Sequence, residues 1–312
     1  MNLQRLIGRY TGATAGPLLI VFGGMHGNEP AGIQALETMF EMLKVEPLTN
    51  PKFNYKGRIV GLRGNLRAIK KKTRFIKKDL NRQFTEENIQ RIRTSPETDL
   101  DAEDKEVKEI LDFVAAEIAD YPTDKIVFLD IHTTTAFGGI FGISTDEAES
   151  VRIAVELHAP VITGMMNGIR GTTLHHFSKK NYGEHAVAVV FEAGQHDEPL
   201  SVMRAIAAIT NCMRTIGSVR GEDVENRHDE ILIEYAKNLP KVARLLKVHR
   251  VYPEDNFKML PDFKNFQPVK KGDILAIDKH GDILAEEDGM ILMPLYQKKG
   301  EDGFFLIREV DY

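Results

Sequence analysis

The chain has 312 residues, of which 42% are apolar and 28% are charged, so it can bury one large hydrophobic core or a large and a small one. Its 41 basic and 46 acidic residues give a formal charge of -5. This balance excludes a global electrostatic field that would favour nucleic acid or an anionic membrane.

Cysteine usage and the apolar runs predict the cellular compartment of the protein and its class of partner. The single cysteine, Cys212, cannot form an internal disulfide, and the first residues lack the basic-then-apolar layout of a signal peptide. The longest apolar runs are far shorter than the roughly 18 residues that indicate a membrane span. We expect a cytoplasmic protein that acts on small molecules, with no nucleic acid and no membrane partner. Both a monomer and a homo-oligomer are compatible with this composition.

Strands and helices alternate through the first two thirds of the chain. The apolar run "PLLIVF" (17–22) predicts a buried strand, and "PAGIQALETMFEML" (30–43) predicts a helix with one apolar face. Further strands are expected at 58–62, 125–132, 159–165 and 186–194, with amphipathic helices at 104–121 and 201–217. This order is typical of an α/β fold, a mixed, mainly parallel sheet with helices on both faces. We assign it to a first domain, residues 1–220.

The remaining residues, 221–312, predict a small C-terminal β-rich domain. A polar segment and one short helical pattern (230–239) precede short strands and turns that begin near Leu245. The stretch "KKGDILAIDKHGDILAEEDGMILMPLY" alternates apolar residues with Gly-Asp and Asp-Gly turns, as antiparallel strands do. It resembles half of a biotinyl or lipoyl hammerhead, but no lysine stands at the tip, so we expect packing rather than carriage of a cofactor.

Polar side chains follow two of the predicted strands. His26 and Glu29 stand in the glycine-rich turn "GGMHGNEPAG", and Asp130 and His132 alternate at the end of "FLDIH". An isolated H-x-x-E is usually a surface turn whose glutamate caps the next helix, but two imidazoles and a carboxylate also form a common catalytic zinc set. Asp130, or one of the threonines after His132, could orient a ligand imidazole through its second nitrogen.

A third strand, "AVVFEAGQH", ends in Glu192. Its simplest interpretation is a half-exposed carboxylate at a strand end. Parallel strands that end in these three motifs would nevertheless meet at one rim of the sheet, where open α/β sheets bind ligands. A carboxylate beside a zinc-bound water is the usual general base, which makes Glu192 the candidate.

The stretch "NLRAIKKKTRFIKKDLNRQF" (65–84) is strongly basic. Taken alone it resembles a nucleic-acid patch, but the rest of the chain is acidic and no aromatic stacking platform accompanies it. We interpret Arg74, Asn81 and Arg82 as groups that bind an anion, because a guanidinium can hold a carboxylate through two hydrogen bonds.

Four motifs in this order resemble the succinylglutamate desuccinylase and aspartoacylase family, which is similar in fold to zinc carboxypeptidases. They are "GGMHGNEPAG", the basic stretch, "LDIHTTTA" and "FEAGQ", within residues 17–195. The resemblance implies a zinc-dependent hydrolase that cleaves the amide bond of an N-succinyl or N-acetyl amino acid. It implies one zinc per chain bound by His26, Glu29 and His132. It further implies that Glu192 is the general base, that Arg74 polarises the scissile carbonyl, and that Asn81 and Arg82 hold a substrate carboxylate.

The sequence departs from the aspartoacylase branch of that family. The branch has an arginine and a tyrosine shortly before the base, whereas "SKKNYGEHAVAVVFE" contains no arginine. A further tyrosine is expected near "GEDGFFLIR", where Phe304 and Phe305 stand. Specificity for N-acetylaspartate is therefore not expected. Tyr182 or these phenylalanines are open as replacements for the tyrosines.

Two other functions stay open at this point. A zinc carboxypeptidase would use the same residues on peptides, and a metal-binding or anion-binding module would retain the fold without turnover. We expect Cys212 to lie in the core. The remaining histidines of this region are expected in loops: His175, His176, His185 and His196.

Overall fold

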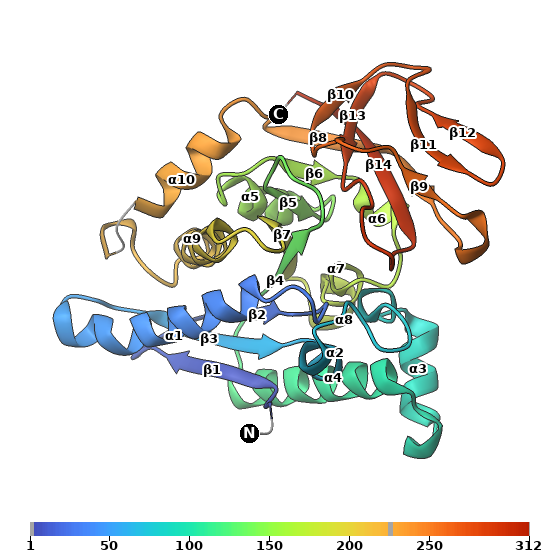
Figure 1. Cartoon of the computed structure of the whole chain (residues 1–312). Coiled ribbons are helices and arrows are strands. Elements are labelled where there is room, and N and C mark those ends of the chain that lie inside the picture. Colours follow the sequence, from blue (N-terminus) through green and yellow to red (C-terminus); the bar gives the residue numbers. More distant parts are fainter. Residues whose placement is uncertain (1–2, 224–226, 312) are drawn as a thin grey trace.

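A computed structural model describes residues 3–223 and 227–311. Within these residues an eleven-stranded mixed sheet runs through the molecule, and a three-stranded antiparallel sheet lies at its C-terminal end (Figure 1). The large sheet contains, in spatial order, β1 (Leu6–Thr11), β3 (Lys56–Arg63), β2 (Thr14–Gly23), β4 (Ile126–Thr134), β7 (Ala186–Gln195), β5 (Phe141–Ser144), β6 (Val161–Thr163), β8 (Val242–Arg250), β14 (Asp302–Glu309), β13 (Gly289–Leu292) and β10 (Gln267–Val269). The small sheet contains β12 (Gly281–Leu284), β11 (Ile274–Asp278) and β9 (Lys258–Met259).

The helices lie mainly beside the first part of the large sheet. They are α1 (Ala31–Thr49), α2 (Leu66–Lys71), α3 (Glu86–Thr94), α4 (Ala102–Asp120), α5 (Ala148–Val155), α6 (Met165–Gly168), α7 (Thr173–His176), α8 (Lys179–Tyr182), α9 (Leu200–Thr215) and α10 (Arg227–Ala236). Short 3-10 turns lie at Leu80–Arg82, Glu97–Asp99, Gly221–Asp223 and Pro253–Asp255.

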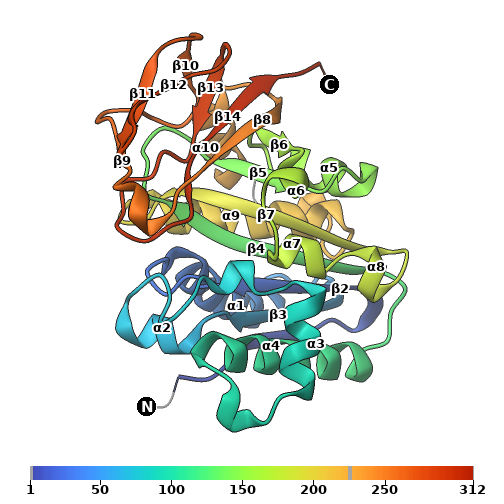
Figure 2. The ribbon, with the colours of Figure 1, turned by 90° about the vertical axis from the view of Figure 1, so that its right-hand side faces the viewer.

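The centre of the large sheet is parallel and buried on both faces. Strands β3, β2, β4 and β7 run parallel to one another. Alternate residues of β2 enter different cores: Leu19 and Val21 pack with α1 and α9, and Leu18 and Ile20 pack with α3 and α4. Figure 2 shows the helices on the two sides of these strands. The predicted α/β class with helices on both faces is confirmed.

The predicted C-terminal β character is also confirmed. Strands β11 and β12 form an antiparallel hairpin within the stretch that predicted one. The large sheet does not end at the expected domain boundary, because β8 pairs in parallel with β6 and β14 pairs with β8. The polar segment before α10 includes residues 224–226, which lie outside the described ranges.

Two further expectations can be compared with the structure. Cys212 is fully buried in the core between α9 and the sheet, as predicted. Burial raises the pKa of its thiol to about 12. In the part of the chain that the structure describes, no helix has the length and apolar character needed to cross a bilayer.

Candidate active site

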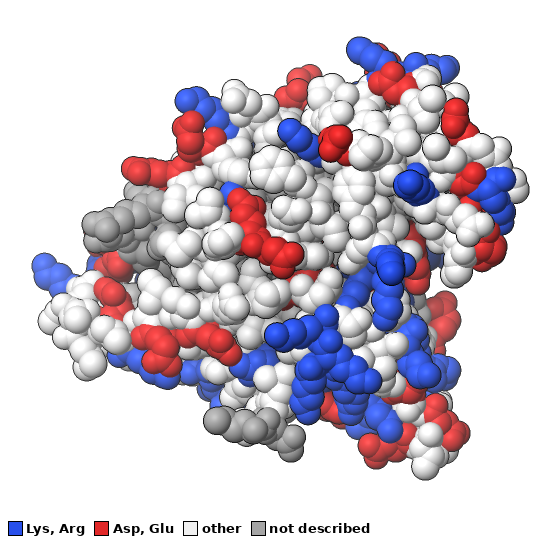
Figure 3. Space-filling model, in the orientation of Figure 1, with Lys and Arg blue, Asp and Glu red and all other residues white. Residues whose placement is uncertain are grey.

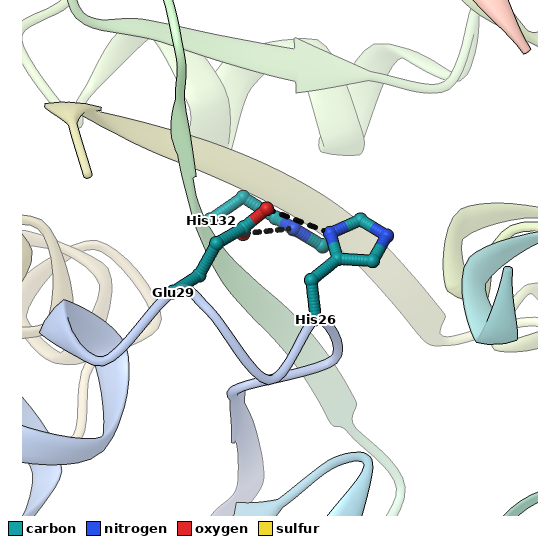
Figure 4. A group of neighbouring side chains, drawn as sticks. All are labelled: His26, Glu29 and His132. Atoms are coloured by element: carbon teal, nitrogen blue, oxygen red, sulfur yellow. Dashed lines mark hydrogen bonds and ion pairs between the residues drawn. The ribbon is translucent and has the colours of Figure 1, made fainter. Parts of the chain in front are cut away.

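His26, Glu29 and His132 form a buried cluster where β2 and β4 end. The Nδ1 atom of His26 lies 2.8 Å from one oxygen of Glu29, and the Nδ1 atom of His132 lies 2.9 Å from the other. Figure 4 shows both imidazoles converging on this carboxylate. Ligand atoms of the three residues lie within 4.8 Å of one another. The structure therefore brings together the three residues that the sequence predicted as ligands.

Glycines allow the turn after β2 to place His26 and Glu29. A side chain at Gly27 would put its Cβ 2.1 Å from the backbone carbonyl carbon of Ala68, a distance at which the two atoms would overlap. Gly24 has a φ of +74°, a left-handed conformation that glycine adopts at little cost. The turn can thus pack directly on the residues of α2.

Each histidine of the cluster has a carboxylate on its far side. Asp130 lies 3.0 Å from Nε2 of His132, which is one of the alternatives that the sequence offered for an orienting group. Asp79 lies 3.1 Å from Nε2 of His26, and sequence reasoning did not single it out. Burial raises the pKa of Asp79, but the charges of Arg74 and His26 outweigh it and hold that pKa well below its usual range.

This donor set fits a zinc ion. Two imidazole nitrogens and one carboxylate are a common catalytic zinc set with a fourth position for water. Carboxylates on the second ring nitrogens fix the tautomer in which Nδ1 is free to bind a metal. Among the described residues, this cluster is the group whose geometry suits a metal.

Glu192 lies beside the cluster on β7. It is the register partner of His132 in the parallel pairing of β4 with β7. Its Oε2 atom is buried and has no hydrogen-bond partner among the described residues. Burial raises the pKa of Glu192 to about 7, against the opposing effect of His132 and with a further contribution from Glu29. A carboxyl group in this state can accept and release a proton near neutral pH.

The two arginines predicted to bind anions already have carboxylate partners. Arg74 donates to Oδ2 of Asp79 from Nε at 3.1 Å and from Nη2 at 2.9 Å. Arg82 is paired with Asp302 of β14, and Arg250 donates to the other oxygen of Asp302. The Nε atom of Arg82 is buried without a hydrogen-bond partner in the described chain.

Asn81 contacts both the start of α7 and the His26–Glu29–His132 cluster. Its Oδ1 accepts a hydrogen bond from the backbone nitrogen of Thr173 at 2.9 Å, and its Nδ2 lies 3.3 Å from Nε2 of His132. All the residues predicted as ligands, base or anion-binding groups line one pocket of about 920 Å³, open mouth included: His26, Glu29, Arg74, Asn81, Arg82, His132 and Glu192.

The lysines of the basic stretch (65–84) are not among the residues that line the pocket. Lys70, Lys71, Lys72 and Lys77 are exposed. Basic side chains gather on the surface over α2 (Figure 3). Nζ of Lys299, from the C-terminal part, donates to the backbone oxygen of Phe75 at 3.0 Å, so that part reaches this stretch.

The candidate replacements for the family's tyrosines separate in space. Tyr182 packs on Phe128 and Phe177 away from the pocket, and burial raises its pKa. Phe304 stacks on His249 in a different core cluster, whereas Phe305 lines the pocket.

Two of the four histidines that were expected in loops also line the pocket. Nδ1 of His196 lies 2.7 Å from the hydroxyl of Thr133, and its Nε2 is buried without a hydrogen-bond partner among the described residues. His175 lies against Thr172, with Nδ1 2.7 Å from its hydroxyl. His176 and His185 are not among the lining residues. The sequence signal for His196 was its position four residues beyond Glu192.

Comparisons with known proteins agree on one family. The profile of the succinylglutamate desuccinylase/aspartoacylase catalytic domain matches residues 15–216. A succinylglutamate desuccinylase of Pseudoalteromonas atlantica is 24% identical over 283 residues, which cover 87% of this chain and 75% of the relative. One from a Shewanella species is 26% identical over 288 residues, covering 86% and 75%.

Solved structures show the same fold. The succinylglutamate desuccinylase of Chromobacterium violaceum superposes with a TM-score of 0.64 at 17% identity, covering 99% of this chain and 95% of the other. Murine aminoacylase 3 gives a TM-score of 0.57 at 16% identity, with coverage of 95% and 96%.

Proposed function

Because the chain belongs to the succinylglutamate desuccinylase/aspartoacylase family and is accordingly a deacylase that hydrolyses amide bonds, we propose that it is zinc-dependent and cleaves a small N-acyl amino acid. The products are a carboxylate and a free amino acid. The observation that carries the proposal is the buried His26–Glu29–His132 cluster with Glu192 beside it in one pocket.

His26, Glu29 and His132 would hold one zinc ion per chain. Zinc bound there would act as a Lewis acid and lower the pKa of a bound water to about 7. Asp79 and Asp130 keep the two imidazoles in the tautomer and orientation that binding requires.

Glu192 carries the proton in this mechanism. Its unpartnered Oε2 takes the proton of the attacking water, and the same oxygen delivers it to the nitrogen of the leaving amine. The buried position that raises its pKa to about 7 suits both steps, since the group must bind and then release one proton.

Arg74 and Arg82 have different tasks in the proposal. Arg74 is held against Asp79 at the metal side of the pocket, where its guanidinium can donate to the negative oxygen that develops on the carbonyl. Arg82 and Asn81, which both line the pocket, hold the α-carboxylate of the substrate, and Nε of Arg82 has no partner among the described residues.

The C-terminal part narrows the pocket in this scheme. We retain the division into an amidohydrolase domain, residues 1–220, and a β-rich domain, residues 221–312, which caps the mouth. Met293, Leu295, Gln297 and Asp302 contribute to the pocket lining. A covered mouth favours small N-acyl amino acids over long peptides, and thus a deacylase over a carboxypeptidase. The cytoplasmic setting stays a prediction from the sequence.

A deacylation screen with zinc supplied tests the proposal. The purified protein should release amino acids from N-acyl amino acids faster than it removes residues from unmodified peptides. His26→Ala and His132→Ala should lose both bound zinc and activity, while His185→Ala, an exposed histidine on the approach to β7, should keep both. Full activity after removal of transition metals would refute the zinc scheme.

A further inference from the structure

The pocket has a continuous apolar side that the proposed chemistry does not use. Its residues come from β5, β7, β14 and the segment that contains α6 and α7, and all are buried in one core cluster. We name it the apolar wall and define it by Ile143, Met165, Ile169, Leu174, Val190 and Phe305.

The apolar wall lies next to the residues that hold the α-carboxylate in the proposed function. The backbone nitrogen of Thr173, between Ile169 and Leu174, donates to Oδ1 of Asn81 at 2.9 Å. The carbonyl of Gly171 accepts from the backbone nitrogen of Phe84, two residues beyond Arg82, at 2.9 Å. A side chain on the carbon that bears this carboxylate therefore lies against the wall.

The charges around the wall do not favour a second carboxylate. Asp302 is buried and gives one oxygen to Arg82 and the other to Arg250. Arg74, the other arginine in the lining, is paired with Asp79. Nε of Arg82 is buried without a partner among the described residues, and the proposed function assigns it to the α-carboxylate. A second carboxylate would be buried against hydrocarbon without a free cation, which is unfavourable.

We propose that the amino acid released by this chain has an apolar side chain, of the size of leucine, methionine or phenylalanine, rather than the acidic side chain of glutamate or aspartate. The inference rests on the proposed function, because it takes Asn81 and Arg82 as the binding groups for the α-carboxylate. The apolar wall selects the side chain, and Asp302 occupies one terminal nitrogen of Arg82 that an acidic side chain would otherwise use.

The test compares kcat/KM of the full-length, zinc-supplied protein across substrates with one acyl group. N-acetyl-leucine, N-acetylmethionine and N-acetylphenylalanine should exceed N-acetylaspartate and N-acetylglutamate by at least about 100-fold, since buried unpaired polar groups discriminate strongly. N-succinyl-leucine and N-succinylglutamate form a second matched pair, compared only with each other. A preference for the acidic substrates would overturn the inference and leave the proposed function intact. Hydrolysis of none of these compounds would instead overturn the proposed function and the inference with it.

Ile169→Ala tests the apolar wall directly. The variant should lower kcat/KM for N-acetyl-leucine relative to N-acetylalanine by about tenfold, because only the longer side chain reaches the missing methyl groups. This ratio does not depend on how much enzyme is folded. Ile209→Ala, a buried isoleucine of α9 in the other core, is the matched control and should leave the ratio unchanged. An unchanged ratio in Ile169→Ala would overturn the role of the wall.

Asp302→Asn tests the charge argument. The variant frees Arg82 and Arg250, so kcat/KM for N-acetylglutamate relative to N-acetyl-leucine should rise by about tenfold. Asp278→Asn makes the same substitution in strand β11 of the small sheet, outside the pocket, and should leave the ratio unchanged. If the ratio in Asp302→Asn equals that of the parent, Asp302 does not exclude acidic side chains, and that part of the inference is wrong.

Discussion

Asp79 joins the metal site to Arg74, so its substitution should affect metal binding and turnover together. Its Oδ1 faces Nε2 of His26 at 3.1 Å and the backbone nitrogen of Asn81 at 2.9 Å, and its Oδ2 faces Nε and Nη2 of Arg74. In Asp79→Asn the amide oxygen can keep the first pair of hydrogen bonds. The amide nitrogen then faces the guanidinium, so donors oppose donors and Arg74 loses its anchor.

The size of the effect follows from these contacts. Loss of a partner behind a metal ligand costs about 10 to 100-fold in metal affinity or activity, or about 1.4 to 2.7 kcal/mol. Asp79→Asn keeps a neutral acceptor for His26, so zinc affinity should fall by about tenfold. Turnover should fall by up to about 100-fold, because Arg74 is no longer held. Asp79→Ala removes both acceptors and leaves Arg74 with Glu29, at 3.6 Å, as its remaining carboxylate partner, so it should also destabilise the fold by about 3 kcal/mol.

Three measurements separate these effects. Zinc affinity comes from competition with a chromogenic chelator, turnover from amino-acid release at saturating zinc, and stability from urea unfolding of the metal-free protein. Asp124→Asn, an exposed aspartate before β4, should match the parent in all three. The reasoning is wrong if Asp79→Asn binds zinc as tightly as the parent and turns over within twofold of it.

Three further predictions use other residues. Glu192→Gln should keep zinc and slow turnover by at least about 100-fold, the usual lower size of general-base catalysis; near-parent turnover would make another carboxylate the base. Arg82→Ala should raise KM and Arg74→Ala should lower kcat, because only the contact of Arg74 with the carbonyl oxygen strengthens in the transition state. Loss of kcat alone in both variants would contradict these two roles. Burial, assisted by Arg93, lowers the pKa of His176 from 6.5 to about 4, so the unfolded chain binds the extra proton between these pH values. The free energy of unfolding should therefore fall as pH drops from 6.5 to 4, by about 1 to 3 kcal/mol, and urea titrations of His176→Asn should show a flatter profile over this window.

The strands that carry the candidate site were predictable because they are buried on both faces. Such strands are continuous apolar runs, as in β4 and β7, and the polar residues that interrupt them stand out at the carboxyl ends. Two other strands were missed. β1 is a half-exposed edge strand, and β5 is buried but has only four residues, so neither has a clear pattern.

The partners of the site residues could not be predicted from the sequence. Asp302 lies 220 positions from Arg82, and no local pattern connects them. Asp79 stands within a lysine-rich stretch, where a carboxylate is most simply interpreted as a surface counterion. Its burial follows from the approach of the stretch to the turn after β2, where the backbone nitrogen of Gly27 donates to the oxygen of Arg74 at 3.2 Å. Tertiary contacts of this kind decide which charges are available to a substrate.

The distribution of these contacts separates chemistry from selectivity in the proposed enzyme. The proposed ligands and base stand on β2, β4, β7 and their turns, within the part of the chain that matches the family. The carboxylate that pairs with Arg82 is Asp302 of β14, outside that part. Since β8 and β14 continue the large sheet, the β-rich part is held in register with the catalytic rim by backbone hydrogen bonds. A change in the last strand can therefore alter which side chain the pocket accepts without moving the groups that break the bond.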